Sequence, residues 1–153
     1  MIKGITPFLW FDGKAEEAMN FYVSIFENSR VLNVNHFNGK VLTVTFELEG
    51  QEFMALNAEP IFKFNEAISF FVSCETQDEV DQSWDKLSAG GEQGRCGWLK
   101  DKFGLWWQII PTALGQLMSD PAPQKSQAVM QAMLKMNKIV IADLERAHEG
   151  KAA

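Results

Sequence analysis

Residues 69–92, SFFVSCETQDEVDQSWDKLSAGGE, contain the pattern of a strand followed by a capped helix. An apolar strand is predicted over residues 67–75, and Thr76 and Glu79 after it have the T-x-x-E spacing of a capping box. The predicted helix has a buried stripe at helical spacing, formed by Val80, Trp84 and Leu87. Gly90-Gly91 is expected to end the helix, because glycine readily adopts the left-handed conformation found after helix ends.

Two short aromatic strands are predicted after this helix, over residues 95–100 and 105–110. The stretch Asp101-Lys102-Phe103-Gly104 between them is expected to form a turn. Residues 66–112 therefore predict a βαβββ module in which the segment between the helix and the last strand is short.

The N-terminal part of the chain shows the same order of elements. A strand is predicted over residues 5–11, and Asp12-Gly13 breaks it. A helix follows, with an apolar stripe at Ala15, Ala18, Met19, Tyr22 and Phe26. Strands are then expected over residues 30–37, 40–49 and 52–57. Asn38-Gly39 is a strong hairpin signal, since both central residues of a type I′ turn need positive φ. Residues 1–58 thus predict a first βαβββ module.

The C-terminal part departs from this repeat. Pro121 and Pro123 are expected to bound a linker, and residues 124–148 predict one helix. Its apolar stripe, formed by Val129, Met133, Met136 and Val140, is expected to pack against the protein's own core or a partner subunit. At 153 residues the chain has the length of one domain, here two modules with a helical extension over residues 123–149.

Composition narrows the classes of function. Hydrophobic residues form 46% and charged residues 22% of the chain, which is typical of a packed globular protein. The formal net charge of -6 argues against a general nucleic-acid binder or an anionic-membrane binder, since both need a basic surface. The N-terminal segment lacks the features of a signal peptide, and the only two cysteines form no redox or zinc motif. We therefore expect a cytoplasmic location.

Several segments resemble the PhnB-like family, also labelled 3-demethylubiquinone-9 3-methyltransferase-like, of the vicinal oxygen chelate superfamily. This superfamily has the glyoxalase/bleomycin resistance/dioxygenase fold. The most specific piece is CGWLKDKFGLWWQIIP at residues 96–111, which follows the segment at residues 69–92. LWFDGKAEEAMNFYVSIF at 9–26 and VMQAMLKMNKIVIADLE at 129–145 are also similar. The resemblance implies an α+β fold in which two βαβββ modules form a cupped mixed sheet, with a C-terminal helix.

The superfamily resemblance also implies a divalent metal in the cup, held by His, Glu or Gln. The corresponding positions here are Thr6, Ala55 (within about one residue), Ser69 and Gln108. Only Gln108 is a plausible ligand, and the other side chains offer neither charge nor a nitrogen donor. We therefore predict no metal site. If the strand register is shifted, the candidate ligands become Glu52, Glu59 and His36.

The sequence gives weaker support for methyl transfer, for nucleophilic catalysis by cysteine and for metal binding by histidine. No G-x-G-x-G loop is present, so the SAM-binding fold expected of a class I methyltransferase is not predicted, and we expect no cofactor. Cys74 and Cys96 are interpreted as structural thiols. His36 and His148 are each interpreted as lone histidines without a metal-binding partner.

The aromatic residues suggest a binding site. Side chains alternate along a strand, so Thr6, Phe8 and Trp10 should share one face, Ser69 and Phe71 another, and Trp106 and Gln108 a third. With these faces turned into the cup, they would line an apolar pocket with a few polar groups, typical of small-molecule sites. The predicted ligand-binding residues are Thr6, Phe8, Trp10, Ser69, Phe71, Trp106 and Gln108.

The sequence is consistent with three interpretations of this site. The preferred one is metal-independent binding of a small apolar or aromatic molecule by a homodimer. The aromatic residues could instead simply fill the core. The third reading is an enzyme, either a metal enzyme of glyoxalase or dioxygenase type or a methyltransferase as the family label says.

Overall fold

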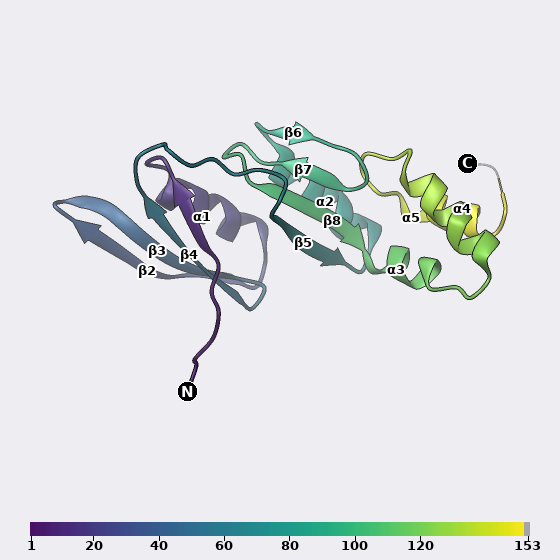
Figure 1. Ribbon diagram of the computed structural model, residues 1–153, viewed down its shortest axis with the longest axis horizontal. Coiled ribbons are helices and arrows are strands. Elements are labelled where there is room, and N and C mark those ends of the chain that lie inside the picture. Colours follow the sequence, from purple (N-terminus) through teal and green to yellow (C-terminus); the bar gives the residue numbers. More distant parts are fainter. Residues whose placement is uncertain (152–153) are drawn as a thin grey trace. The chain divides into compact units, whose positions relative to one another are not determined.

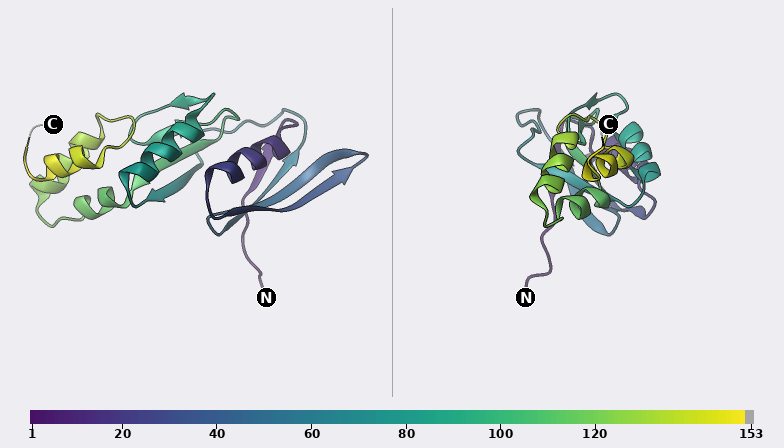
Figure 2. Two further views of the ribbon diagram at one scale, coloured as in Figure 1. Left: turned by 180° about the vertical axis from the view of Figure 1, so that it is seen from behind. Right: turned by 90° about the vertical axis from the view of Figure 1, so that its right-hand side faces the viewer.

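A computed structural model describes residues 1–151, which fall into two compact units (Figure 1). The first unit comprises residues 1–63 and the second begins at Phe64. Each unit contains a four-stranded sheet with a helix along one face, and the second unit has three further helices (Figures 1 and 2). The two units are described separately below.

The first unit contains one helix and four strands, in the order β1 (Phe8–Phe11), α1 (Ala15–Ile25), β2 (Ser29–Phe37), β3 (Lys40–Leu48) and β4 (Gln51–Asn57). The strand order in the sheet is β1-β4-β3-β2. β1 pairs with β4 in parallel, and the other pairs are antiparallel. The predicted Asn38-Gly39 turn is confirmed, with φ of 50° and 76° at the two residues.

Helix α1 packs on one face of the first sheet because its apolar stripe meets an apolar strand face. The buried side chains of the helix are Ala15, Ala18, Met19 and Tyr22. They face a buried sheet surface formed by Leu9, Phe11, Val44, Phe46, Leu48, Phe53 and Ala55. The helix N-terminus is fixed from β4, where the Asn57 side-chain oxygen accepts a 2.8 Å hydrogen bond from the Ala15 amide.

The second unit repeats this arrangement. Its elements are β5 (Ser69–Cys74), α2 (Gln77–Ser88), β6 (Glu92–Gln93), β7 (Trp98–Lys100) and β8 (Trp106–Pro111). The sheet order is β5-β8-β7-β6, with β5 and β8 parallel, which matches the order in the first unit. The α+β fold of two βαβββ modules is therefore confirmed.

Helix α2 begins at the predicted capping box. The Thr76 hydroxyl accepts a hydrogen bond from the Glu79 amide, and the Glu79 carboxylate accepts one from the Thr76 amide. Val80, Trp84 and Leu87 are buried, as their spacing predicts. Gly90 follows the helix with a φ of 76°, a conformation that glycine adopts without steric strain.

Strand register divides each sheet into two faces. We call the face that the helix leaves uncovered the front face. In the first sheet Phe8 lies beside Met54 and Trp10 beside Leu56 on the front face. In the second sheet one transverse row is formed by Ser69, Trp106, Lys100 and Glu92. The next row is formed by Phe71, Gln108 and Trp98.

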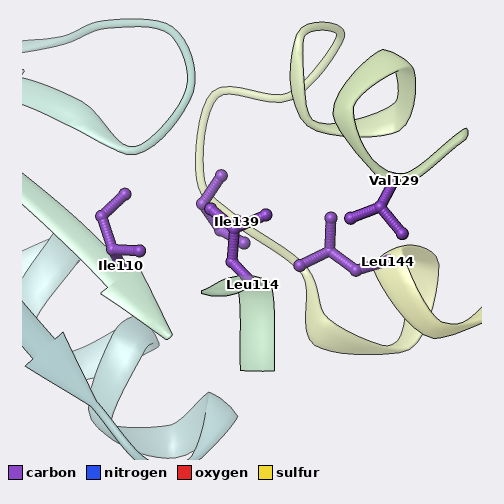
Figure 3. Packing of buried hydrophobic residues seen from close by; sticks show 5 residues of the cluster. All are labelled: Ile110, Leu114, Val129, Ile139 and Leu144. Atoms are coloured by element: carbon purple, nitrogen blue, oxygen red, sulfur yellow. The ribbon is translucent and has the colours of Figure 1, made fainter. Parts of the chain in front are cut away.

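The C-terminal part of the second unit differs from the single helix expected over residues 124–148. It contains α3 (Thr112–Met118), α4 (Pro123–Met133) and α5 (Ile141–His148), which gather beyond the end of β8 (Figure 1). Residues 134–140 between α4 and α5 are not helical. The three helices pack around a buried cluster of Ile110, Leu114, Val129, Ile139 and Leu144 (Figure 3), in which Ile110 comes from β8 and Ile139 from the segment before α5. Met133 and Met136 pack against this cluster.

Tertiary hydrogen bonds explain the break between α4 and α5. The carbonyls of Met136 and Asn137 accept 2.8 Å hydrogen bonds from the Cys96 and Gly97 amides. The Gln77 side chain donates to the Ile139 carbonyl and accepts from the Ile141 amide. These bonds hold the segment in turns and bends, so docking onto the second sheet overrides its local helix preference.

No helix within residues 1–151 is long and apolar enough to cross a membrane.

Candidate functional site

The front face of the second sheet carries two half-exposed tryptophans that pack against each other. The ring centroids of Trp98 and Trp106 are 6.4 Å apart, with an edge-to-face angle of 61°. The Lys100 ammonium nitrogen lies 5.8 Å from the Trp106 ring centroid, within cation-π range. It also lies 3.4 Å from the Glu92 carboxylate. The face therefore combines aromatic side chains with a lysine that is paired with a carboxylate.

Polar groups lie next to these rings. The Gln108 side-chain amide donates a 2.9 Å hydrogen bond to the Ser69 hydroxyl, across β8 and β5. Phe71, which pairs with Gln108, is 59% exposed. Such a mixture of aromatic surface and a few convergent polar groups is the usual character of a ligand-binding surface.

The 101–104 turn holds the tryptophans of β8 in place. Asp101 is buried, and its carboxylate accepts hydrogen bonds from the Phe103 and Leu105 amides at 2.8 and 3.0 Å. It also accepts a 2.9 Å hydrogen bond from the Trp107 indole nitrogen. Trp107 is thereby fixed on the helix-covered face. Since neighbouring strand residues point to opposite faces, Trp106 is directed to the front.

The front face of the first sheet carries a second aromatic group. Trp10 contacts Phe62 edge-on, with ring centroids 4.9 Å apart, and its indole nitrogen donates a 2.8 Å hydrogen bond to the Glu59 carbonyl. Phe8, two residues earlier, is 51% exposed. Thr6 lies before β1 and donates a 3.3 Å hydrogen bond to the Glu52 carboxylate.

The seven predicted ligand-binding residues fall into two sets. Thr6, Phe8 and Trp10 belong to the first unit. Ser69, Phe71, Trp106 and Gln108 belong to the second, where the register gathers them in two adjacent rows. No side chain of either set is fully buried.

The prediction missed Trp98, Lys100 and Glu92, which share the rows of the second set. Alternation along the strand already places Trp98 and Lys100 on one face. What the sequence does not give is the pairing of Trp98 with Gln108 and of Lys100 with Trp106. The position expected near Ala55 also needs correction: Ala55 is fully buried on the helix-covered face, and its front-face neighbours in β4 are Met54 and Leu56.

The residues present do not fit the metal that the fold family implies. Thr6, Met54, Leu56 and Ser69 offer no imidazole, thiolate or carboxylate, and the Gln108 amide is hydrogen-bonded to Ser69. No cluster of three or more His, Cys, Asp or Glu with metal-binding geometry occurs within residues 1–151. His36 is exposed on β2, and His148 contacts Asp120 at 2.8 Å.

The cysteines are not arranged for nucleophilic catalysis. Cys74 is buried at the end of β5, and burial, together with the nearby Glu79 charge, raises the pKa of its thiol to about 11. Cys96 is half-buried, with a φ of 58°, and its amide donates to the Met136 carbonyl. The Cys74 thiol is thus protonated at neutral pH, as expected of a structural cysteine.

Comparisons with solved structures agree with this fold. The PhnB protein of Bacillus cereus is 38% identical, with a TM-score of 0.68, and the match covers 72% of this chain and 100% of that one. Protein PA1353 of Pseudomonas aeruginosa is 17% identical, with a TM-score of 0.59 and coverage of 72% and 98%.

A more distant match is FosX of Listeria monocytogenes, a fosfomycin resistance protein crystallised with Mn(II) and sulfate. It is 14% identical, with a TM-score of 0.50, and coverage is 70% of this chain and 88% of FosX. At this identity the match shows a shared fold. A search of curated proteins gave no match.

A family model described as 3-demethylubiquinone-9 3-methyltransferase matches residues 3–110. The matched region covers both βαβββ modules, and α3, α4 and α5 lie after it. The chain is therefore a member of the PhnB-like family described as 3-demethylubiquinone-9 3-methyltransferase.

Proposed function

We propose that this protein binds a small aromatic or apolar molecule on its front faces without a metal ion. The observation that carries the proposal is the different environment of adjacent tryptophans on β8. Trp107 is buried and hydrogen-bonded to Asp101, whereas Trp106 is half-exposed beside Trp98. Trp106 offers ring surface on which a flat molecule can stack, and Trp98 stands edge-on beside it.

The energetics favour a planar ligand. Stacking on aromatic rings contributes about 0.5–1.5 kcal/mol per pair beyond the burial of apolar area. The second sheet offers Trp106, Trp98 and Phe71 on adjacent rows. Gln108 and Ser69 already satisfy each other through their hydrogen bond, but each retains further hydrogen-bonding capacity for a polar ligand group.

An enzyme is the alternative. A metal enzyme of glyoxalase or dioxygenase type would need ligands other than the residues at the positions that the family implies, such as Glu52, Glu59 or His36. The methyltransferase activity in the family's description would need a bound methyl donor.

We also propose that the protein is a cytoplasmic homodimer. Large apolar side chains are exposed on β2 (Val31, Leu32 and Phe37), on α4 (Met130) and directly after α4 (Leu134), and an interface between two copies would cover such surfaces. Both cysteines are free thiols, which suits a reducing compartment. Light scattering after size-exclusion chromatography tests the dimer.

The proposed function is tested by elemental analysis of the purified protein, with melting curves in chelator and in added Mn²⁺, Zn²⁺ and Ni²⁺. We expect no stoichiometric metal and no ion-specific rise in Tm. A ligand at 100 times its Kd would raise stability by about 2.7 kcal/mol, which a melting curve detects readily. Bound metal at one ion per chain, or a shift with one particular ion, would favour the metal-enzyme alternative.

Substitution of Trp106 tests the location of the site. Trp106→Leu should weaken binding of a flat aromatic probe such as 2-naphthoate and leave the fold intact. Trp84→Phe on the helix-covered side is the matched control, since Trp84 is a buried residue of α2 and its replacement should not affect affinity. Equal affinity of wild type and Trp106→Leu would contradict the proposed site.

A further inference from the structure

We infer that the front face of the second sheet selects aromatic anions, such as small aromatic carboxylates, and that Lys100 determines this selectivity. The inference rests on the proposed function, because it names the ligand class of that binding face. It arises from the row formed by Ser69, Trp106, Lys100 and Glu92.

The geometry places a positive charge over the Trp106 ring. Lys100 and Trp106 are direct cross-strand partners, and the ammonium nitrogen is 5.8 Å from the ring centroid. A planar ligand stacked on Trp106 would bring a substituent on its rim within reach of this ammonium group. The Lys100 side chain is 33% exposed, so its charge is partly shielded from water and acts more strongly than a free surface charge.

The neighbouring polar groups also favour a ligand that accepts hydrogen bonds. The Ser69 hydroxyl accepts from Gln108, which leaves its own proton free for donation. Gln108 uses its amide nitrogen in this bond, and that nitrogen carries a second hydrogen. Together with Lys100, these groups form a set of donors that suits a carboxylate or phenolate oxygen.

Glu92 competes with a bound anion for the Lys100 ammonium group. Its carboxylate lies 3.4 Å from the ammonium nitrogen, but its side chain is 69% exposed. A pair with so exposed a partner contributes little to stability in water. A bound carboxylate can therefore replace Glu92 as the partner of the ammonium group at a small cost in free energy. Removing the charge of Glu92 should increase the affinity for the anion.

The first sheet differs from the second in the charge that lies next to its aromatic residues. Its aromatic residues Phe8 and Trp10 lie near Thr6, which is hydrogen-bonded to the carboxylate of Glu52. Within the described residues, no lysine or arginine takes the place beside Trp10 that Lys100 has beside Trp106. Selection of an anion is therefore assigned to the second sheet.

The experiment compares 2-naphthoate with 2-naphthamide, which has nearly the same shape but no charge. Binding is measured by isothermal titration calorimetry in EDTA at low salt. The wild type should bind the naphthoate roughly fivefold more tightly, the ratio expected of a half-exposed charge pair. This preference should weaken as salt is added.

Three variants test the roles of the charges. Lys100→Gln should abolish the preference for the anion while retaining 2-naphthamide binding. Glu92→Gln should increase naphthoate affinity and leave naphthamide affinity unchanged. Lys86→Gln is the matched control, because Lys86 is exposed in the last turn of α2 on the other side of the sheet.

Each outcome distinguishes this inference from the proposed function. Equal wild-type affinity for both probes would overturn the selection of anions and leave metal-independent binding intact. Binding of neither probe would overturn both. A preference that survives in Lys100→Gln would overturn the role of Lys100. If the melting curve shows that Lys100→Gln is misfolded, the Glu92→Gln variant provides the test. Unchanged naphthoate affinity in Glu92→Gln would contradict the inference.

Discussion

The Asp101 carboxylate accepts a 2.9 Å hydrogen bond from the Trp107 indole nitrogen, and both residues are buried. Two backbone amides of the 101–104 turn and its exit, those of Phe103 and Leu105, bond to the same carboxylate. This turn therefore links β7 to β8 and holds Trp107 on the helix-covered face. The front-face position of Trp106 follows from that constraint.

Replacing Asp101 should destabilise the protein. Asp101→Ala leaves buried N–H donors unsatisfied, so we expect the free energy of unfolding to fall by about 2–4 kcal/mol. Urea denaturation followed by tryptophan fluorescence measures this change. The matched control is Asp85→Ala, at an exposed position of α2, which should change stability by less than about 0.5 kcal/mol. A loss in Asp101→Ala as small as that of the control would refute the role of the carboxylate.

Two glycines with similar positive φ allow the cost of a steric clash to be distinguished from the cost of backbone strain. Gly97 and Gly104 have φ of 83° and 91°, so alanine should cost about 1–2 kcal/mol at either position. A Cβ at Gly104 would meet open space, whereas one at Gly97 would lie 2.8 Å from the Ile109 carbonyl oxygen and 2.7 Å from Ile110 Cδ1. We expect Gly97→Ala to lose clearly more stability than Gly104→Ala in parallel melting experiments. Equal losses would show that the predicted clash is relieved.

The Gln77 side chain should hold the non-helical 134–140 segment in place. Gln77→Ala removes bonds to the backbone of Ile139 and Ile141, and we expect a loss of about 1–3 kcal/mol. Hydrogen exchange should then become faster at the Ile141 amide. Gln82→Ala, on an exposed part of the same helix, provides the control. Unchanged exchange at Ile141 would argue against this anchoring role.

The pKa of Cys74 predicts a loss of stability at alkaline pH. Burial raises the pKa of this thiol to about 11, so the folded state favours the protonated form more than the unfolded chain does. The resulting stabilisation is complete below the thiol's ordinary pKa and is lost as pH rises toward about 11. Cys74→Ala should flatten this part of the pH profile of Tm. The same slope in wild type and variant would contradict the assignment.

Thiol labelling gives an independent check on Cys74. At pH 8 the native protein should react with a disulfide reagent at Cys96 well before Cys74, because Cys96 is half-buried and Cys74 is buried. A Cys96→Ser variant should therefore label only on unfolding. Rapid labelling of that variant in the native state would show that Cys74 is accessible.

Local signals in the sequence were sufficient for most of the fold. The Thr76 and Glu79 capping box, the Asn38-Gly39 turn and the alternation along β1, β5 and β8 act over a few residues, and each has its expected structure. The break between α4 and α5 was not predictable from local pattern. It depends on hydrogen bonds from Cys96 and Gly97, about 40 residues away in the chain.

The candidate site was predictable only in part, for a related reason. A period of two places Trp106 and Gln108 on one face without any knowledge of neighbouring strands. The contact of Lys100 with Trp106 depends on strand register, and β6, which supplies Glu92, has two residues and too weak a pattern to be recognised. The position near Ala55 was uncertain by one residue, and one residue of register exchanges the two faces of a strand.

Indole signals in a ¹H–¹⁵N NMR spectrum test the central claim most directly. The five tryptophans fall into two groups: Trp10, Trp98 and Trp106 are half-exposed on the front faces, while Trp84 and Trp107 are buried on the helix-covered side. Titration with 2-naphthoate in EDTA should shift the indole signals of Trp98 and Trp106, with those of Trp84 and Trp107 unchanged. Shifts that require an added divalent metal, or that are confined to the buried pair, would contradict metal-independent binding on the front face.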